Sequence, residues 1–192
     1  VRSVEPVRPG FVRAGSVTSQ GDAAAGAPQA RATGFDGTGV TVGVISDGIH
    51  RLGLAIGSGN LPASTIVPPG LDCTPGTGDE GTAMLEIVHD LAPGAALRFS
   101  QGFTDKLAFV DSITCLRNAR AQVIVDDIGF FDEPFFEDGL VAEAVRAAVE
   151  AGVSYHSAAG NSAEGHYTAP FRATATSDGT LHSFAAGAAP DT

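Results

Sequence analysis

The chain has 192 residues, which is enough for one well-buried domain and short for two. It carries 11 Lys and Arg against 22 Asp and Glu, a formal charge of -11, which argues against nucleic acid and anionic membranes as partners. No apolar run approaches the roughly 20 residues of a membrane-spanning helix, and the acidic composition suits a secreted protein or one that works at mildly acidic pH.

Hydrophobic patterning predicts alternating helices and strands through most of the chain. Residues 1–20 contain Pro6 and Pro9 and predict an extended N-terminal arm. The pattern then predicts, in chain order, a helix at 21–33, a strand at 40–45, a short helix at 52–60, a strand at 65–67, a helix at 78–95, a strand at 96–100, a helix at 105–120, a strand at 123–128, a helix at 139–151 and a strand at 153–157. Residues 162–192 are irregular, with one strand-like run at 180–184. We therefore expect an arm (1–20) and one α/β domain (21–192) that is incomplete at its C-terminal end.

Alternating strands and helices are typical of a doubly wound α/β fold, in which helices cover both faces of a mostly parallel sheet. Such folds place their sites beyond the carboxyl ends of the strands. Asp47, the Asp126/Asp127 pair and Asn161 lie at the ends of three predicted strands, and Glu80 lies at the start of the helix after the second strand. One crevice could therefore hold all of these groups.

Three short motifs, in this order along the chain, resemble subtilisin-like serine peptidases. The run 42–48 (Val-Gly-Val-Ile-Ser-Asp-Gly) resembles the strand and catalytic aspartate of that family. The run 123–129 (Val-Ile-Val-Asp-Asp-Ile-Gly) lies where the family has the strand that lines the substrate cleft. The run 153–161, which ends in Ala-Ala-Gly-Asn, resembles the strand that delivers the oxyanion-hole asparagine. The resemblance implies a subtilisin-like α/β fold and a polypeptide substrate that contacts Asp127 and Gly129.

The position of the general base departs from that family. Subtilisin-like peptidases have His-Gly-Thr-His there, whereas residues 80–83 read Glu-Gly-Thr-Ala. A glutamate at this place, on a helix ending in Leu-Ala-Pro-Gly-Ala, is similar to the related sedolisins, acid-active serine peptidases that use a Glu/Asp pair. Their aspartate lies one helical turn later, where this chain has Met84. The resemblance thus implies a variant site, with Glu80 as general base, Asp47 orienting it and Asn161 in the oxyanion hole.

The sequence lacks the family's nucleophile motif. Subtilisin-like peptidases carry the serine in a Gly-Thr-Ser-x-(Ala/Ser)-x-Pro segment after the asparagine, and nothing of that form occurs between Asn161 and Thr192. Ser157 and Ser162 do not have that context. We therefore expect the serine to come from a C-terminal segment or a second chain outside these residues, and we expect activity only where that segment is present.

The chemistry of two adjacent acids sets the expected pH range. Two carboxylates in contact cannot both ionise cheaply, so Asp47 and Glu80 are expected to share a proton and titrate as a pair. A glutamate is a weak base towards a serine hydroxyl, which predicts activity at acidic to mildly acidic pH. None of the five histidines has a position that favours it over Glu80 as the base.

Each candidate also has a purely structural interpretation. Asp47 before a glycine suits a strand-end turn, and Glu80 suits the first turn of a helix. Asn161 after a glycine suits a left-handed turn. Asp126 and Asp127 alternate across a sheet, so at most one of them faces the crevice. Two alternatives to a peptidase therefore stay open: a catalytically inactive relative that binds peptides or another protein along the same cleft, and an esterase built on the same fold.

The remaining reactive residues leave two further questions open. Cys73 and Cys115 fit either one disulfide, which favours an oxidising compartment and secretion, or two buried free thiols. No metal centre or cofactor is predicted. The acids Glu133, Glu137 and Asp138 predict a solvated loop, with a structural calcium site as the alternative.

Overall fold

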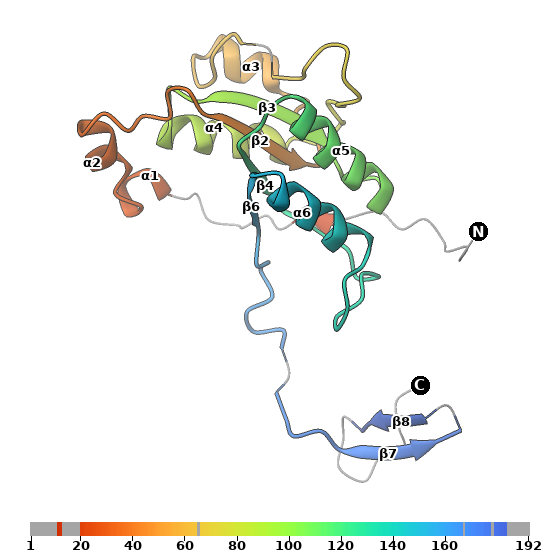
Figure 1. Cartoon of the computed structure of the whole chain (residues 1–192). Coiled ribbons are helices and arrows are strands. Elements are labelled where there is room, and N and C mark those ends of the chain that lie inside the picture. The colour runs from red at the N-terminus through yellow and green to blue at the C-terminus, as the bar shows by residue number, and fades with distance from the viewer. Residues whose placement is uncertain (1–10, 13–19, 65, 167, 178, 184–192) are drawn as a thin grey trace. The chain divides into compact units, whose positions relative to one another are not determined.

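The computed structural model in Figure 1 describes residues 11–12, 20–64, 66–166, 168–177 and 179–183. The chain divides into two compact units, 1–161 and 162–192. The first unit contains the sheet and all the helices described. The second contains an antiparallel hairpin of β7 (Ala173–Thr176) and β8 (Gly179–His182). The strand-like run predicted at 180–184 is thus β8 in part, and Phe184 lies outside the described residues.

A four-stranded parallel sheet forms the centre of the first unit (Figure 1). Its strands lie in the order β3 (Ala96–Gln101), β2 (Thr41–Ser46), β4 (Val123–Asp126) and β6 (Ser154–Ser157). All three pairings are parallel. The predicted α/β class with a mostly parallel sheet is therefore confirmed.

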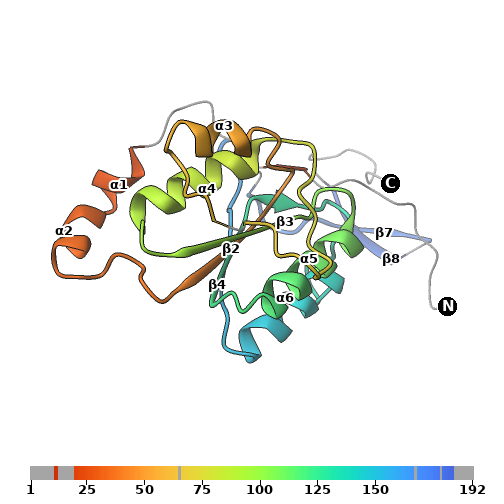
Figure 2. The ribbon, with the colours of Figure 1, turned by 90° about the horizontal axis from the view of Figure 1, so that it is seen from above.

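Helices cover both faces of this sheet, as Figure 2 shows from above. Helix α4 (Glu80–Leu91) lies on one face, and α5 (Lys106–Asn118) and α6 (Leu140–Glu150) lie on the other. The short helices α1 (Gly21–Ala24) and α3 (Leu52–Gly57) contact α4, and α2 (Ala27–Ala32) contacts α1. Alternate residues of β2 explain the two layers, because successive side chains of a strand point to opposite faces. Val42 and Val44 pack in one core cluster with Leu85 of α4, whereas Ile45 packs in the other with Phe109 of α5.

The order of the strands reverses at β2. The chain runs from β2 through α4 to β3 on one side, then through α5 to β4 on the other side of β2. Because the two connecting helices cover opposite faces, the carboxyl ends of β2 and β4 flank a topological switch point. Open α/β sheets bind their ligands at such points.

Two predicted elements are split in the structure. The helix predicted at 21–33 is two short helices, because Gly26 adopts a φ of 71° between them. The strand predicted at 123–128 breaks at Asp127 into β4 and β5 (Ile128–Gly129). Strand β5 leaves the parallel sheet and pairs antiparallel with β1 (Phe11–Val12), which belongs to the predicted N-terminal arm.

The strand predicted at 65–67 is not confirmed. Thr65 lies outside the described residues, and neither Ile66 nor Val67 is in a strand. The Ile66 carbonyl nevertheless accepts a hydrogen bond from the amide of Phe99 at 2.9 Å. The segment thus contacts β3 without forming a ladder.

A disulfide joins Cys73 and Cys115. Of the two alternatives for these cysteines, the bridge is therefore the one that forms. It fastens the loop before α4 to helix α5. In the part of the chain that the structure describes, no helix combines the length and the apolar character needed to cross a membrane.

Candidate active site

Asp47 follows β2, and its carboxylate lies at the N-terminus of α4. Its Oδ1 accepts a hydrogen bond from the backbone amide of Glu80 at 3.0 Å. Amides in the first turn of a helix lack partners within the helix, and the helix dipole favours negative charge there. The structure therefore joins the two predicted catalytic acids through the backbone of Glu80.

Two glycines allow the loop before α4 to approach Asp47. A Cβ on Gly78 would overlap the Asp47 carboxyl group, and a Cβ on Gly48 would overlap the backbone of Gly78. Backbone hydrogen bonds fix the approach: the Gly78 amide donates to the Asp47 carbonyl at 3.3 Å, and the His50 amide donates to the Gly78 carbonyl at 2.9 Å. The position of Glu80 beside Asp47 thus depends on Gly48 and Gly78, because a larger residue at either place would push the loop away.

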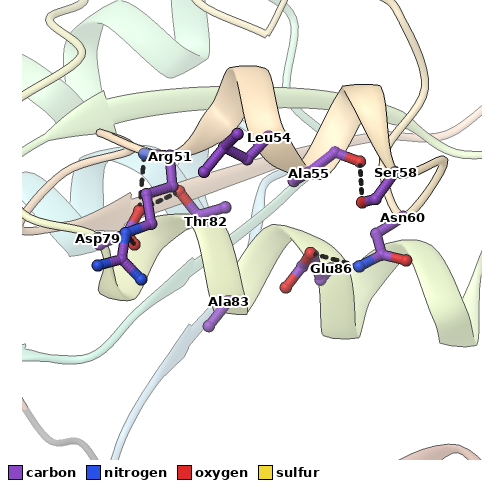
Figure 3. Close-up of a pocket in the computed structure, with 9 residues that line it drawn as sticks. All are labelled: Arg51, Leu54, Ala55, Ser58, Asn60, Asp79, Thr82, Ala83 and Glu86. Carbon is purple, nitrogen blue, oxygen red and sulfur yellow. Dashed lines mark hydrogen bonds and ion pairs between the residues drawn. The ribbon is translucent and has the colours of Figure 1, made fainter.

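The two acids at the start of α4 have different surroundings. Asp79 accepts hydrogen bonds from the Arg51 amide at 2.9 Å and the Thr82 hydroxyl at 2.8 Å, and it forms an ion pair with Arg51 (Figure 3). These contacts tie α4 to the start of α3, so Asp79 has a structural role. The carboxylate of Glu80 has no such partner among the described residues. Burial, and then the charge of Asp47, raise the pKa of Glu80.

Asp127 lies between β4 and β5 and is 5% exposed. Neither of its buried carboxylate oxygens has a hydrogen-bond partner among the described residues. Burial is the main cause that raises the pKa of Asp127 to about 6, and the charges of Glu80, Asp47 and Asp126 raise it further. The Ser46 hydroxyl lies near enough to oppose this rise, although it makes no hydrogen bond of good geometry.

The neighbouring Asp126 is held by other partners. It accepts hydrogen bonds from the Ser157 hydroxyl at 2.9 Å and from the Ile128 amide at 3.3 Å. These contacts join β4 to β6 and to the start of β5. Burial and the adjacent Asp126 raise the pKa of the Tyr155 hydroxyl. Asp126 therefore belongs to the sheet, whereas Asp127 interacts with Glu80 and Asp47.

A hollow of about 380 Å³ opens beside Asp47. It is lined by Asp47, Gly76, Thr77, Gly78, Gln101, Phe103 and Thr104. With its amide turned to satisfy both neighbours, the Gln101 side-chain oxygen accepts from the backbone amides of Phe103 and Thr104 at 2.9 and 3.0 Å. Sequence reasoning missed Gln101, Phe103 and Thr104, because residues at and after the end of β3 show no periodicity.

A larger groove of about 460 Å³ lies between α3 and α4 (Figure 3). Its lining includes Asp79 and Glu86 but neither Asp47 nor Glu80. Glu86 accepts a hydrogen bond there from the side chain of Asn60 at 3.1 Å. The acids that line this groove are therefore engaged in joining the two helices. We place the candidate active site at the smaller hollow, because Asp47 lines it, while Glu80 and Asp127 are not part of its lining.

The two remaining predicted residues lie on neighbouring segments. Gly129 is buried in β5, where it pairs with Phe11. Asn161 follows Gly160, which has a φ of 85°, shortly after β6, and the side chain of Asn161 is exposed. Parallel strands place it near the same edge of the sheet as Asp47, but the interactions found for the Asp47, Glu80 and Asp127 carboxylates do not include it.

The candidate site therefore brings together three acids whose charges repel one another. Within the described ranges, no group of three or more His, Cys, Asp or Glu side chains is placed to hold a metal ion. The calcium alternative stays an untested prediction. In comparisons with known proteins, no family model matches the chain and no curated protein matches it.

Proposed function

We propose that this chain is the N-terminal portion of a subtilisin-like serine peptidase in which Glu80 is the general base. One observation carries the proposal: Asp47, Glu80 and Asp127 converge at the switch point of a parallel α/β sheet. Structural ion pairs join opposite charges, as Asp79 and Arg51 do. A group of like charges at a switch point, one of them buried and two half-buried, instead suggests a functional site.

The proposed reaction is acyl transfer through a serine hydroxyl that a segment outside these residues supplies. The hydroxyl oxygen attacks the scissile carbonyl, and its proton passes to the Glu80 carboxylate. Glu80 then gives this proton to the leaving amine nitrogen as the C–N bond breaks, which leaves an acyl ester on the serine. Water attacks the ester by the same route and restores the hydroxyl.

The other residues position these groups. Asp47 fixes the first turn of α4 through the amide of Glu80. The side-chain amide of Asn161 donates to the developing oxyanion, a contact usually worth ~3 kcal/mol. A polypeptide substrate reaches the hollow beside Asp47. Its contact with Asp127 and Gly129 stays an untested prediction, because both are buried and Gly129 is paired with β1. The Cys73–Cys115 disulfide supports a secreted, extracellular location.

The test is an assay of this chain together with the serine segment, on peptide and ester substrates between pH 3 and pH 8. We expect peptide cleavage that is fastest at acidic to mildly acidic pH, labelling of one serine by a fluorophosphonate, and a loss of about 10³-fold or more in kcat for E80Q. E86Q is the matched control, because it makes the same change on the same helix at a residue bound to Asn60. Full activity of E80Q would refute the proposal, and cleavage of esters alone would favour the esterase.

A second candidate, a peptide-binding domain without catalysis, is favoured by the pairing of β1 with β5. The arm residues Phe11 and Val12 add an antiparallel strand to Ile128 and Gly129, so this edge accepts an extended peptide. A synthetic peptide of residues 6–17 should then bind a chain that begins at Gln20, and calorimetry measures the affinity. If the peptide binds the E80Q variant of this shortened chain with the same affinity, and the assay above shows no cleavage, the peptide-binding domain is favoured over the peptidase.

A further inference from the structure

Asp127 is buried without hydrogen-bond partners in the described structure, unlike the neighbouring Asp126. Both acids are nearly inaccessible, with exposures of 4% for Asp126 and 5% for Asp127. Asp126 accepts two hydrogen bonds, from Ser157 and Ile128, whereas the oxygens of Asp127 have no partner in the described part of the chain. An ionised carboxylate buried without hydrogen bonds is costly, so the neutral acid is the stable form of Asp127.

The charges that act on Asp127 come from three elements and are all negative. Glu80 acts from the first turn of α4, Asp47 from the end of β2, and Asp126 from β4. The deepest acid with the fewest partners takes up a proton first, because protonation there removes both the burial cost and the repulsion. The Ser46 hydroxyl is fully buried and has no partner of its own in the described structure, so it can share that proton.

We propose that Asp127 is a positioning residue that holds the proton of the three-acid cluster, so that Glu80 stays a carboxylate and can act as the base. This inference rests on the proposed peptidase function for its role. With Asp127 neutral, the cluster carries fewer negative charges. The proton that relieves the repulsion among the three acids is then on Asp127 and not on Glu80. Asp127 itself neither gains nor loses a proton in the reaction.

The consequence concerns the acid side of the pH–rate profile. Below a pH of about 6 Asp127 is neutral, so its charge does not oppose the ionisation of Glu80. Glu80 then becomes a carboxylate at a lower pH than it would beside an ionised Asp127, and it can accept the serine proton in acidic solution. D127N is neutral at every pH and should therefore keep the acid limit of the wild-type profile.

The experiment is a titration of side-chain carboxyl carbons by NMR on the 192-residue chain, in the wild type and in D127N, E80Q and E86Q. We expect the signal that disappears in D127N to titrate near pH 6 in the wild type. Its midpoint should fall by about half a pH unit or more in E80Q, because one repelling charge is gone. Because Asp127 is neutral while Glu80 titrates, the Glu80 signal should titrate at nearly the same pH in D127N as in the wild type. E86Q should leave both midpoints unchanged.

Two outcomes would overturn the inference: an Asp127 midpoint near its ordinary value of 3.8, or a midpoint that E80Q does not move. The Asp127 midpoint is read in the wild type, so a D127N or E80Q variant that fails to fold still leaves the first of these tests. The titration needs neither a serine nor a substrate. A failed peptidase assay therefore leaves the result intact, and an uncoupled titration leaves the peptidase proposal to be judged on its own assay.

Discussion

A carboxyl group that is buried without a hydrogen-bond partner couples the stability of this fold to pH. The pKa of Asp127 is about 6 in the folded chain, against an ordinary value of 3.8. Between these values the folded state binds more protons than the unfolded state, so its stability falls as the pH rises. The contribution is fully present below pH 4 and is lost as the pH passes through 6. A difference of about two pH units in pKa corresponds to about 3 kcal/mol.

Urea unfolding at several values between pH 4 and pH 7 measures this contribution. The free energy of unfolding of the wild type should fall by on the order of 2–3 kcal/mol more than that of D127N over this range. The difference between the two proteins isolates Asp127, since the other titrating groups are common to both. Parallel curves for the two proteins would show that Asp127 ionises freely in the fold.

Gly78 tests whether the close approach of the loop to Asp47 matters. A Cβ at Gly78 would overlap the Asp47 carboxyl group, whereas a Cβ at Gly53 of α3 meets nothing within 4 Å. We expect G78A to destabilise the chain by about 1–3 kcal/mol, because the loop or Asp47 must move. G53A is the matched control and should be neutral or stabilising by up to about 1 kcal/mol, as is usual for Ala in a helix. Thermal unfolding of both variants gives the answer, and equal melting temperatures would contradict it.

At the scale of the elements, local signals account for most of what the sequence predicts correctly. Helix α4 is predicted at 78–95 and runs from Glu80 to Leu91, because its apolar period and the Pro93-Gly94 stop are both local. The break between β4 and β5 has a distant cause. It accompanies the pairing of β5 with β1, more than a hundred residues earlier in the chain, and no pattern around Asp127 reports that partner.

In the candidate site, too, local sequence signals predict some features, whereas others depend on contacts between distant segments. Strand ends and a helix start suffice to predict that Asp47 and Glu80 meet, because the fold brings those ends together. The sequence does not reveal that Asp47 binds the backbone amide of Glu80. That detail follows from the packing of Gly48 on Gly78, which only the folded loop defines. The loss of hydrogen-bond partners by Asp127 likewise depends on burial from several elements at once.

The disulfide should stabilise the element that carries Glu80. Cys73 and Cys115 are 42 residues apart, and closing a loop of this length contributes about 4 kcal/mol in the chain-entropy estimate. Because Cys73 lies in the loop that leads into α4, reduction also frees that loop from α5. We expect dithiothreitol to lower the free energy of unfolding by about 2–4 kcal/mol. The C73S/C115S variant should show the lower value without the reductant, and no response of the wild type would contradict the prediction.

At the scale of the whole molecule, the formal charge of -11 is a second electrostatic influence on stability, separate from the burial of Asp127. Net charge far from zero destabilises a compact chain through self-repulsion, and salt screens this repulsion between exposed groups. At pH 7 we therefore expect the melting temperature to rise when NaCl increases from about 0.01 M to about 0.5 M, over which the Debye length falls from about 30 Å to a few ångströms.

Salt distinguishes the effect of the net charge on stability from the effect of Asp127, because buried charges are screened much less than exposed ones. The salt-dependent rise should be the same for the wild type and D127N, since both carry nearly the same surface charge. The pH-dependent difference between them should survive in about 0.5 M NaCl, because burial of Asp127, which is 5% exposed, is the main cause of its raised pKa and salt does not screen it. Thermal unfolding of both proteins at two pH values and two salt concentrations tests this. If salt abolishes the difference between them, the cluster is open to solvent and Asp127 does not hold its proton through burial.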